Sequence, residues 1–372
     1  MMISFFLSIL LLILGYFLYG KLVEHIFAPN DKPTPALTLT DGTDYVPMKT
    51  SKIFLIQLLN IAGIGPIFGA ILGALWGPVV FLWIALGSIL AGGVHDYLSG
   101  MISLRHQGNS ISETVGIYLG KTIKQVMRVF SVILMVLVGT VFMTSPASLL
   151  ANLTPNSLGM SFWVVMIFVY YILATILPIN KLIGRIYPFF GFILLIMAFG
   201  IAGSLVLSGH HIPDLQLQNL HPDALPIWSM MFITVACGAV SGFHATQSPM
   251  MARCLKIEKD GRKVFYGAMI AEGFIALIWA AAGVAFYETT GGLAQALTNL
   301  GGQAGVVYDI SFSLLGTVGG LLAIIGVVIC PITSGDTAFR SARLISVSYT
   351  HLDVYKRQIP GHSCFTNIFP SV

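Results

Sequence analysis

The sequence predicts an all-α, polytopic membrane protein with about nine transmembrane helices, two of them discontinuous. Of its 372 residues, 56% are hydrophobic and only 9% are charged, whereas soluble domains carry about 25% charged residues. Nine apolar runs are long enough to cross a hydrocarbon core of about 30 Å, which needs about 20 helical residues. Two of these runs are interrupted by glycine and proline.

The predicted spans follow one another along most of the chain. The first lacks the basic start and the small-residue cleavage site of a signal peptide, so we expect it to be retained as a span. The nine runs are residues 3–20, 53–76, 79–98, 129–150, 161–179, 187–208, 228–250, 264–287 and 308–331.

The loops between the spans predict the orientation. Every loop after an odd-numbered span carries Lys or Arg, as with Arg105, Lys121, Lys124 and Arg128 after the third, and the other loops carry none. Basic loops stay in the cytoplasm. The N-terminus is therefore expected outside, and one missed helix would have disrupted the alternation.

The second span, IFLIQLLNIAGIGPIFGAILGALW, has Gly63, Gly65 and Pro66 in its middle. Proline lacks an N–H group and clashes with the preceding turn, and glycine favours unwinding. Freed main-chain groups cost several kcal/mol each in hydrocarbon, so they persist only inside protein or beside a polar cavity. This interruption predicts a binding site.

The seventh span, WSMMFITVACGAVSGFHATQSPM, is interrupted in the same way and crosses the membrane in the opposite direction, five spans later. Interrupted helices at corresponding positions of two halves indicate an inverted-repeat secondary transporter with a site at mid-membrane. Close helix packing is the alternative explanation for such glycines. The predicted substrate-binding residues are Ala62, Gly63, Ile64, Gly65, Pro66, Gly238, Ser241, Gly242 and His244.

Three titratable residues inside spans are candidates for coupling or gating, because a charge there costs about 2.5 kcal/mol or more. Glu272 is either a proton carrier or a carboxyl that holds helices together. Asp96, next to His95, either caps a helix end or acts as a gate or ion ligand. His244 either bonds a loose carbonyl or contacts the substrate or a proton.

Thr333, Ser334 and Asp336 offer oxygen atoms suited to a hard cation such as Na⁺, although hydroxyls also bond their own helix. The cysteines Cys237, Cys254, Cys330 and Cys364 lack metal-binding spacing and are expected to be small buried apolar residues. We therefore expect no metal and no cofactor, apart from a coupling H⁺ or Na⁺.

The chain is expected to divide into a transmembrane transporter domain, residues 1–345, and a non-native tail, residues 346–372. Spans two to six form the first repeat, about 53–208. The second repeat, about 228–345, contains three of its five helices, so the chain is expected to be a C-terminally truncated fragment.

Several functional classes are disfavoured. The sequence contains no P-loop, GxSxG, HExxH or CxxC motif, which argues against an ATP-driven pump. The basic residues follow the topology rather than forming a nucleic-acid surface. No convergent nucleophile and base indicate an enzyme. A channel and a nutrient sensor or receptor without net transport remain as alternatives.

Several strings resemble the CstA carbon-starvation family of bacterial inner-membrane proteins. They are DGTDYVP at 41–47, IAGIGPIFG at 61–69, AGGVHDY at 91–97, FITVACGAVSGFHATQSP at 232–249, the span with Glu272, and TSGDTAFRSAR at 333–343. The resemblance implies a multi-pass transporter of the amino acid/polyamine/organocation type, with the inverted five-helix repeat of LeuT-like proteins. It also implies uptake of peptides during starvation, or of pyruvate driven by protons; both substrates carry a carboxylate, and the lipid bilayer is the other partner.

Overall fold

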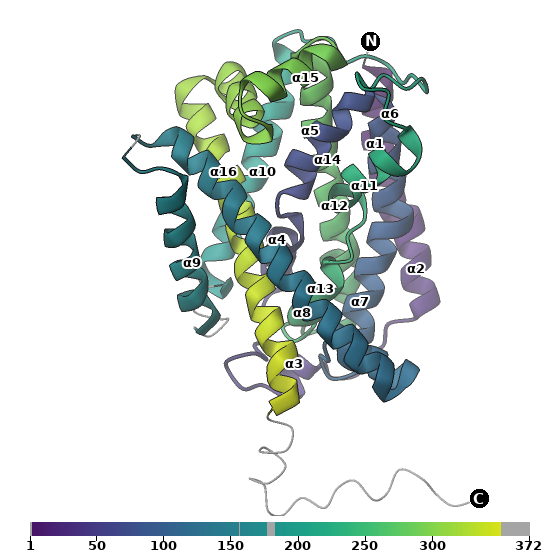
Figure 1. The fold of residues 1–372 in the computed structure, drawn as a ribbon. Helices are drawn as coiled ribbons and strands as arrows, with labels where there is room; N and C mark the ends of the chain where they lie inside the picture. The colour runs from purple at the N-terminus through teal and green to yellow at the C-terminus, as the bar shows by residue number, and fades with distance from the viewer. Residues whose placement is uncertain (1, 156, 177–182, 351–372) are drawn as a thin grey trace, which may run out of the picture.

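In the computed structural model, residues 2–155, 157–176 and 183–350 are described, and every regular element within them is a helix (Figure 1). Six helices are long and apolar enough to cross a membrane, and two bent pairs raise the number of candidate spans to eight. The predicted fifth span coincides with α9, Met160–Ile176, which is shorter. The prediction of an all-α, multi-pass membrane protein is confirmed.

The first half of the chain supplies most of the long helices. α1 (Ile3–Leu14) continues through a π-helical turn into α2 (Gly20–Phe27), and α3 (Pro35–Thr38) is a short helix in the following loop. α4 (Thr50–Ala62) and the helical turns from Gly65 to Trp76, which include α5 (Ala70–Gly73), form the first bent pair. The next elements are α6 (Val79–Leu86), α7 (Gly93–Arg105), α8 (Ile111–Leu153), α9 and α10 (Ile183–Leu207).

The second half contains the other bent pair and the central helix. The first half of this bent pair is the helical segment Ile227–Thr234, which includes α11 (Phe232–Thr234). The second half contains α12 (Ala236–Ala239) and α13 (His244–Ala252). They are followed by α14 (Gly267–Phe286), α15 (Thr290–Asn299) and α16 (Gln303–Thr350). The predicted tail falls on the last turn of α16 and on residues outside the described part.

Two of the longest helices bend at a glycine with positive φ. Gly120 interrupts α8 with φ of 88°, and Gly316 interrupts α16 with φ of 66°. Only glycine adopts this conformation readily. The predicted fourth span therefore corresponds to the part of α8 that follows Gly120, whereas Gly316 lies inside the predicted ninth span, residues 308–331, and bends it.

α14 lies at the centre of the bundle (Figure 1), and 16 of its 20 residues are buried. Its second half, around Ala280 to Gly283, is made of small residues, and a Cβ on Gly283 would lie 2.9 Å from the Cβ of Ala74. Small residues let helices approach closely, which replaces the missing hydrophobic driving force inside a bilayer. α14 is therefore the central helix against which both bent pairs pack.

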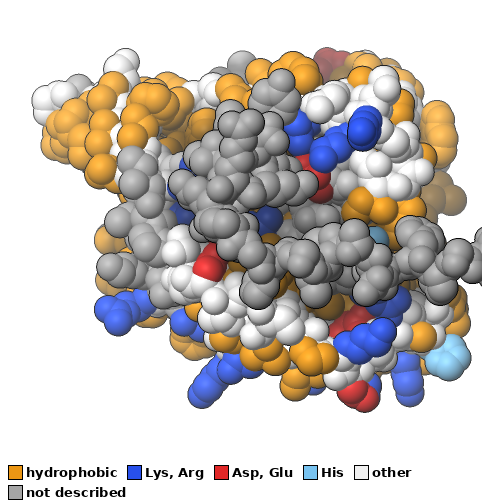
Figure 2. Space-filling model, turned by 90° about the horizontal axis from the view of Figure 1, so that it is seen from below, with side chains coloured by type: hydrophobic (Ala, Val, Ile, Leu, Met, Phe, Trp, Pro, Cys, Tyr) orange, Lys and Arg blue, Asp and Glu red, His pale blue; other side chains and the backbone are white. Residues whose placement is uncertain are grey.

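Ion pairs join the loops that follow spans one, three and seven at one end of the bundle. Arg105 Nε lies 2.7 Å from Glu258 Oε1, and Arg262 Nε lies 2.6 Å from Glu24 Oε2. Figure 2 shows Lys and Arg side chains spread over this face, whereas α15 lies at the opposite end (Figure 1). The loops predicted to share one side of the membrane thus share one end of the structure.

The loop between α3 and α4 belongs to this end. Asp41 Oδ1 accepts hydrogen bonds from the main-chain N–H groups of Thr43, Asp44 and Tyr45, at 2.8 to 2.9 Å. Although partial burial acts in the opposite direction, these donors hold the pKa of the Asp41 carboxyl below its ordinary value. The Tyr45 hydroxyl then donates to the carbonyl of Gln107, so the string DGTDYVP folds as a turn against the α7–α8 loop.

A stripe of glycines packs the two bent pairs together. Gly65, Gly69 and Gly73 lie four residues apart, and a Cβ on each would meet an atom of Cys237, Thr234 or Val235 at 2.2, 2.9 and 2.4 Å. Residues four apart share one face of a helix. This face of the second span therefore holds the seventh span in direct contact.

We predict that Gly65→Ala destabilises the protein, because the new methyl group would overlap Cys237. Overpacking of this kind costs about 1–3 kcal/mol. The matched control is Gly203→Ala in α10, where a Cβ meets nothing within 4 Å and alanine favours the helix. Thermal unfolding in detergent should show a lower midpoint for the first variant only, and equal midpoints would contradict the packing role of Gly65.

Candidate functional site

The second span changes direction at its predicted glycines, whereas the seventh bends three residues before Gly238. α4 ends at Ala62, Gly63 has φ of 50° and ψ of −134°, and the helix that resumes at Gly65 is tilted by 58°. The seventh span bends by 68° at Val235. After α12, its main chain is extended at Val240, with φ of −161°, before α13 begins at His244.

The two interruptions lie side by side. A Cβ on Gly65 would be 2.2 Å from the Cβ of Cys237, and a Cβ on Gly238 would be 3.3 Å from the Cα of Pro66. Figure 1 shows the ends of α4 and α12 near the middle of the height of the bundle. Irregular main chain from two oppositely directed spans thus meets at one point.

A serine from a third element supports the first interruption. Ser334 Oγ of α16 donates to the carbonyl of Leu59 at 2.7 Å and accepts from the N–H of Gly63 at 3.1 Å. Thr333 Oγ1 donates to the carbonyl of Cys330 in its own helix at 2.8 Å. Ser334 therefore replaces helical hydrogen bonds that the interruption removes, and a cation at this position would compete with the main chain for both hydroxyls.

A cavity of about 470 Å³ lies over the two interruptions, next to the residues that follow α15. Ile64, Gly65 and Cys237 line it from the interrupted spans, and Thr144, Ser145 and Ser148 line it from α8. The remaining lining residues are Phe68, Gly69, Leu72, Val141, Met160, Thr234, Gly301, Gln303 and Ala304. The lining offers hydroxyls, one amide, one thiol and apolar groups, without a charged side chain among these residues.

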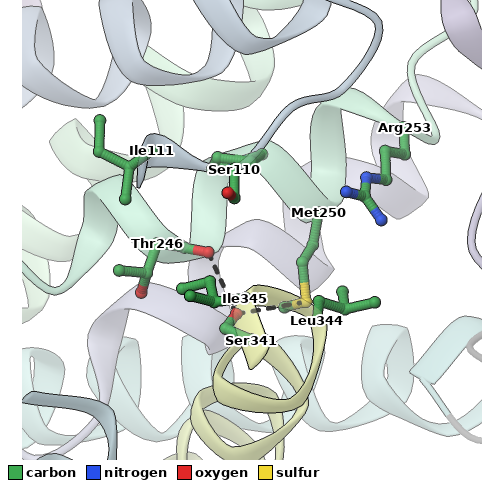
Figure 3. Close-up of a pocket in the computed structure, with 9 residues that line it drawn as sticks. Ser110, Ile111, Thr246, Met250, Arg253, Ser341, Leu344 and Ile345 are labelled. Atoms are coloured by element: carbon green, nitrogen blue, oxygen red, sulfur yellow. Dashed lines mark hydrogen bonds between the residues drawn. The ribbon is translucent and has the colours of Figure 1, made fainter. Parts of the chain in front are cut away.

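Toward the opposite end, a small pocket lies between α13, α16 and the start of α8 (Figure 3). Ser341 Oγ donates to the carbonyl of Thr246 at 3.1 Å and lies 3.5 Å from the sulfur of Met250. The pocket that remains there has about 20 Å³, roughly the room for one water molecule. Among the described residues, the larger cavity thus reaches the interruptions from the α15 end, and the Ser341–Thr246 contact lies toward the end with the basic loops.

Three fully buried titratable side chains meet beside the second interruption. His244 Nδ1 lies 3.1 Å from Asp96 Oδ2, and His244 Nε2 lies 3.7 Å from Glu272 Oε2. His95 Nδ1 approaches Asp96 Oδ1 to 2.9 Å, and its side chain is 31% exposed. We call Asp96, His244 and Glu272 the buried triad; its members come from α7, α13 and α14.

Asp336 lies in a different place from the other coupling candidates. The Tyr187 hydroxyl of α10 donates to Asp336 Oδ2 at 2.5 Å. Arg340, one turn later on α16, is fully buried and donates to the carbonyl of Ala174 at 2.5 Å. The predicted coupling residues therefore divide into the buried triad, the Ser334 support and a separate Asp336–Tyr187 contact.

Some residues of the site were missed by sequence reasoning. Ser241 and Gly242 lie where expected, between α12 and α13, but Cys237 was assigned only a packing role although it lines the cavity. The hydroxyls of Thr144, Ser145 and Ser148 were not considered. Hydroxyls on both sides of Pro146 within an apolar span were the available signal for them.

Comparison with protein families decides the relationship. The family model described as carbon starvation protein CstA matches residues 1–162 and 152–298. The chain belongs to the CstA family. Both interruptions and the buried triad fall within the matched residues, whereas Ser334 and Asp336 lie beyond them.

Several bacterial proteins are similar in sequence to this CstA-family chain. An uncharacterized membrane protein of Haemophilus influenzae is 44% identical over 350 aligned residues, which cover 80% of this chain and 94% of that protein. Peptide transporter CstA of Escherichia coli is 26% identical over 337 residues, covering 73% of this chain and 48% of the transporter. Peptide transporter CstA of Bacillus subtilis is 28% identical over 341 residues, covering 74% and 57%. The chain spans about half the length of these named transporters.

We predict that Ser334→Ala lowers the stability of this CstA-family protein by about 1–3 kcal/mol, the cost of leaving a buried main-chain group without a partner. Ser313→Ala is the matched control, because Ser313 lies on the same helix and is exposed. Thermal unfolding in detergent is the measurement. A shift of the same size in both variants would show that the Ser334 bonds do not support the first interruption.

Proposed function

We propose that this protein is a secondary active transporter that takes up a small carboxylate-bearing solute, a short peptide or pyruvate, across the bacterial inner membrane during starvation. The N-terminus would lie outside, and a proton or cation gradient would drive uptake. The observation that carries the proposal is the meeting of two interrupted, oppositely directed spans at the floor of a cavity.

The floor of the cavity is suited to a carboxylate. Main-chain groups near Ile64 and Gly65 lie at the start of the helical segment that runs to Trp76, and such helix starts favour negative charge. Hydroxyls of Thr144 and Ser145 face the same space. Because a charged side chain is not among the lining residues, these neutral dipoles would bind the anion, and weak binding of this kind permits release on the other side.

The size and walls of the cavity favour a peptide over pyruvate. Its volume of about 470 Å³ lies within the range of about 300–1,000 Å³ that is typical of small-molecule pockets. Phe68, Leu72 and Val141 provide apolar walls for side chains of varied shape. The relatives from three bacterial lineages named peptide transporter CstA support the same choice.

Alternating access would follow if the two interruptions act as hinges. The proposed outward-facing state has its cavity at the α15 end and its closed contact at Ser341 and Thr246. Rocking of the bent pairs against α14 would open that contact and close the cavity. Downhill movement of the coupling ion biases the cycle inward, because it binds the two states with different affinity.

Uptake by proteoliposomes that contain the full chain tests the function. We expect saturable uptake of labelled dipeptides, accumulation when a proton or cation gradient is imposed, and weaker competition by pyruvate. Saturable binding without uptake would instead identify a nutrient sensor, and conductance far above carrier rates would identify a channel. Either result would overturn the transporter proposal.

We also predict that substrate protects Cys237 from a small membrane-permeant thiol reagent, because this thiol lines the cavity next to Gly65. The test uses a variant with Cys364→Ser, in which Cys254 and Cys330 are fully buried and serve as internal controls. A dipeptide should slow the labelling of Cys237 several-fold, and the same dipeptide with its carboxyl converted to an amide should not. Equal protection by both would argue against carboxylate binding at the interruptions.

A further inference from the structure

We infer that the buried triad, together with His95, is a proton relay that leads from the floor of the cavity to the opposite side of α7. The inference rests on the proposed transport function and makes it more specific: the coupling ion is a proton, and its route is Glu272, His244, Asp96 and His95.

The geometry of His244 is that of a relay. Its two ring nitrogens face different carboxylates on different helices, Nε2 toward Glu272 at 3.7 Å and Nδ1 toward Asp96 at 3.1 Å. A neutral imidazole carries a proton on one nitrogen only. One carboxylate would then face a nitrogen lone pair, so the arrangement calls for an additional proton on the ring or on a carboxyl.

The net charge of the triad also favours the binding of an additional proton. With both carboxylates ionised and His244 protonated, the fully buried group carries one net negative charge, which is expensive in a medium of low dielectric constant. The other titratable groups that face it are His95 of α7 beside Asp96, and Cys237 of α12 and Cys330 of α16 beside Glu272. Binding of one proton neutralises the group.

Both ends of the route are placed for exchange of protons. At one end, neither carboxyl oxygen of Glu272 has a hydrogen-bond partner among the described residues, and Cys237, which interacts with Glu272, lines the cavity. At the other end, His95 is 31% exposed and lies 2.9 Å from Asp96. The titratable side chains between these ends are buried and adjacent.

The transfers balance with one proton moved per cycle. Glu272 takes a proton from the cavity, and protonated His244 passes the proton on Nδ1 to the Asp96 carboxylate, which passes it to His95 Nδ1; His95 releases it on its exposed side. Rotation of the His244 ring then exchanges its two nitrogens, and the bare nitrogen takes the proton from Glu272, which restores the starting state. The route needs a nearer approach of Glu272 to His244 than 3.7 Å, and His244 lies on the first turn of α13, directly after the second interruption.

The position of Glu272 also explains how a proton and an anionic substrate would bind together. Glu272 lies one turn before Ala276, whose Cβ would be 3.2 Å from a Cβ on Gly238. A carboxylate bound at the interruptions would repel an ionised Glu272 across this short distance in a medium of low dielectric constant. Substrate and proton therefore favour each other, which is the requirement for symport. Ser334 and Thr333, which a cation would need, are already bonded to main chain.

Proteoliposomes that contain the full chain and an internal pH dye test the relay. With dipeptide added, the wild type should take up protons with the substrate. In His244→Gln and in Glu272→Gln, we expect coupled proton uptake to fall about 100-fold, the usual contribution of a positioned proton-transfer group. The matched control is His221→Gln: His221 is also buried but packs against Trp76, away from the triad. Coupled proton uptake at the wild-type ratio in either triad variant would overturn the relay.

A second measurement separates failure of the relay from failure of the transport function. Infrared difference spectra after a pH jump should show a carboxylic-acid band that is absent in Glu272→Gln. If the wild type shows this band but transports nothing, the transport proposal fails and the relay stands. If the band is missing from the wild type, the relay fails. Should His244→Gln not fold, Glu272→Gln and His95→Gln decide, because they alter the two ends of the route.

Discussion

The structure depends on one constraint: main-chain N–H and C=O groups released inside a membrane must find partners within the protein. The first interruption releases such groups around Gly63, and hydrogen bonds from two places satisfy them. Ser334 of α16 bonds Leu59 and Gly63, and the carbonyl of Ile64 accepts from the N–H of Phe68 at 2.7 Å, while the Phe142 ring of α8 packs against Gly63. The position of α16 beside α4 therefore meets a need that the break in α4 creates.

The same constraint explains why the charged residues gather where they do. A carboxylate in the hydrocarbon region persists only with a partner, and His244 provides a partner for two carboxylates because it has two ring nitrogens. It stands at the start of α13, where the second interruption has already removed regular helix. Irregular main chain and buried charge share the small volume beside α14, so movement of the broken helix changes the electrostatics of the triad, and a change in its protonation acts on the helix.

The sequence was sufficient to predict an all-α, multi-pass membrane protein, to find the two interrupted spans and to identify the family, because hydropathy and Gly/Pro positions are local signals. It was not sufficient for the partners of individual polar residues. Ser334 and Asp336 were grouped because both offer oxygen atoms to a cation, yet residues two positions apart do not face each other on a helix. Ser334 meets α4, and Asp336 meets Tyr187 of α10. The triad joins residues separated by 148 positions along the chain between Asp96 and His244, and no local pattern indicates such a contact.

The closed contact between Ser341 and Thr246 gives the proposed cycle its direction. It lies on α13, the helix that also carries His244, and on α16, the helix that carries Ser334. His244 and Thr246 are two residues apart on this short helix, so a tilt of α13 would change the His244–Glu272 distance and the Ser341–Thr246 contact together. Because α13 is bounded by the second interruption at its start and by a turn after Ala252, it is short enough to tilt as a unit while α14 stays in place.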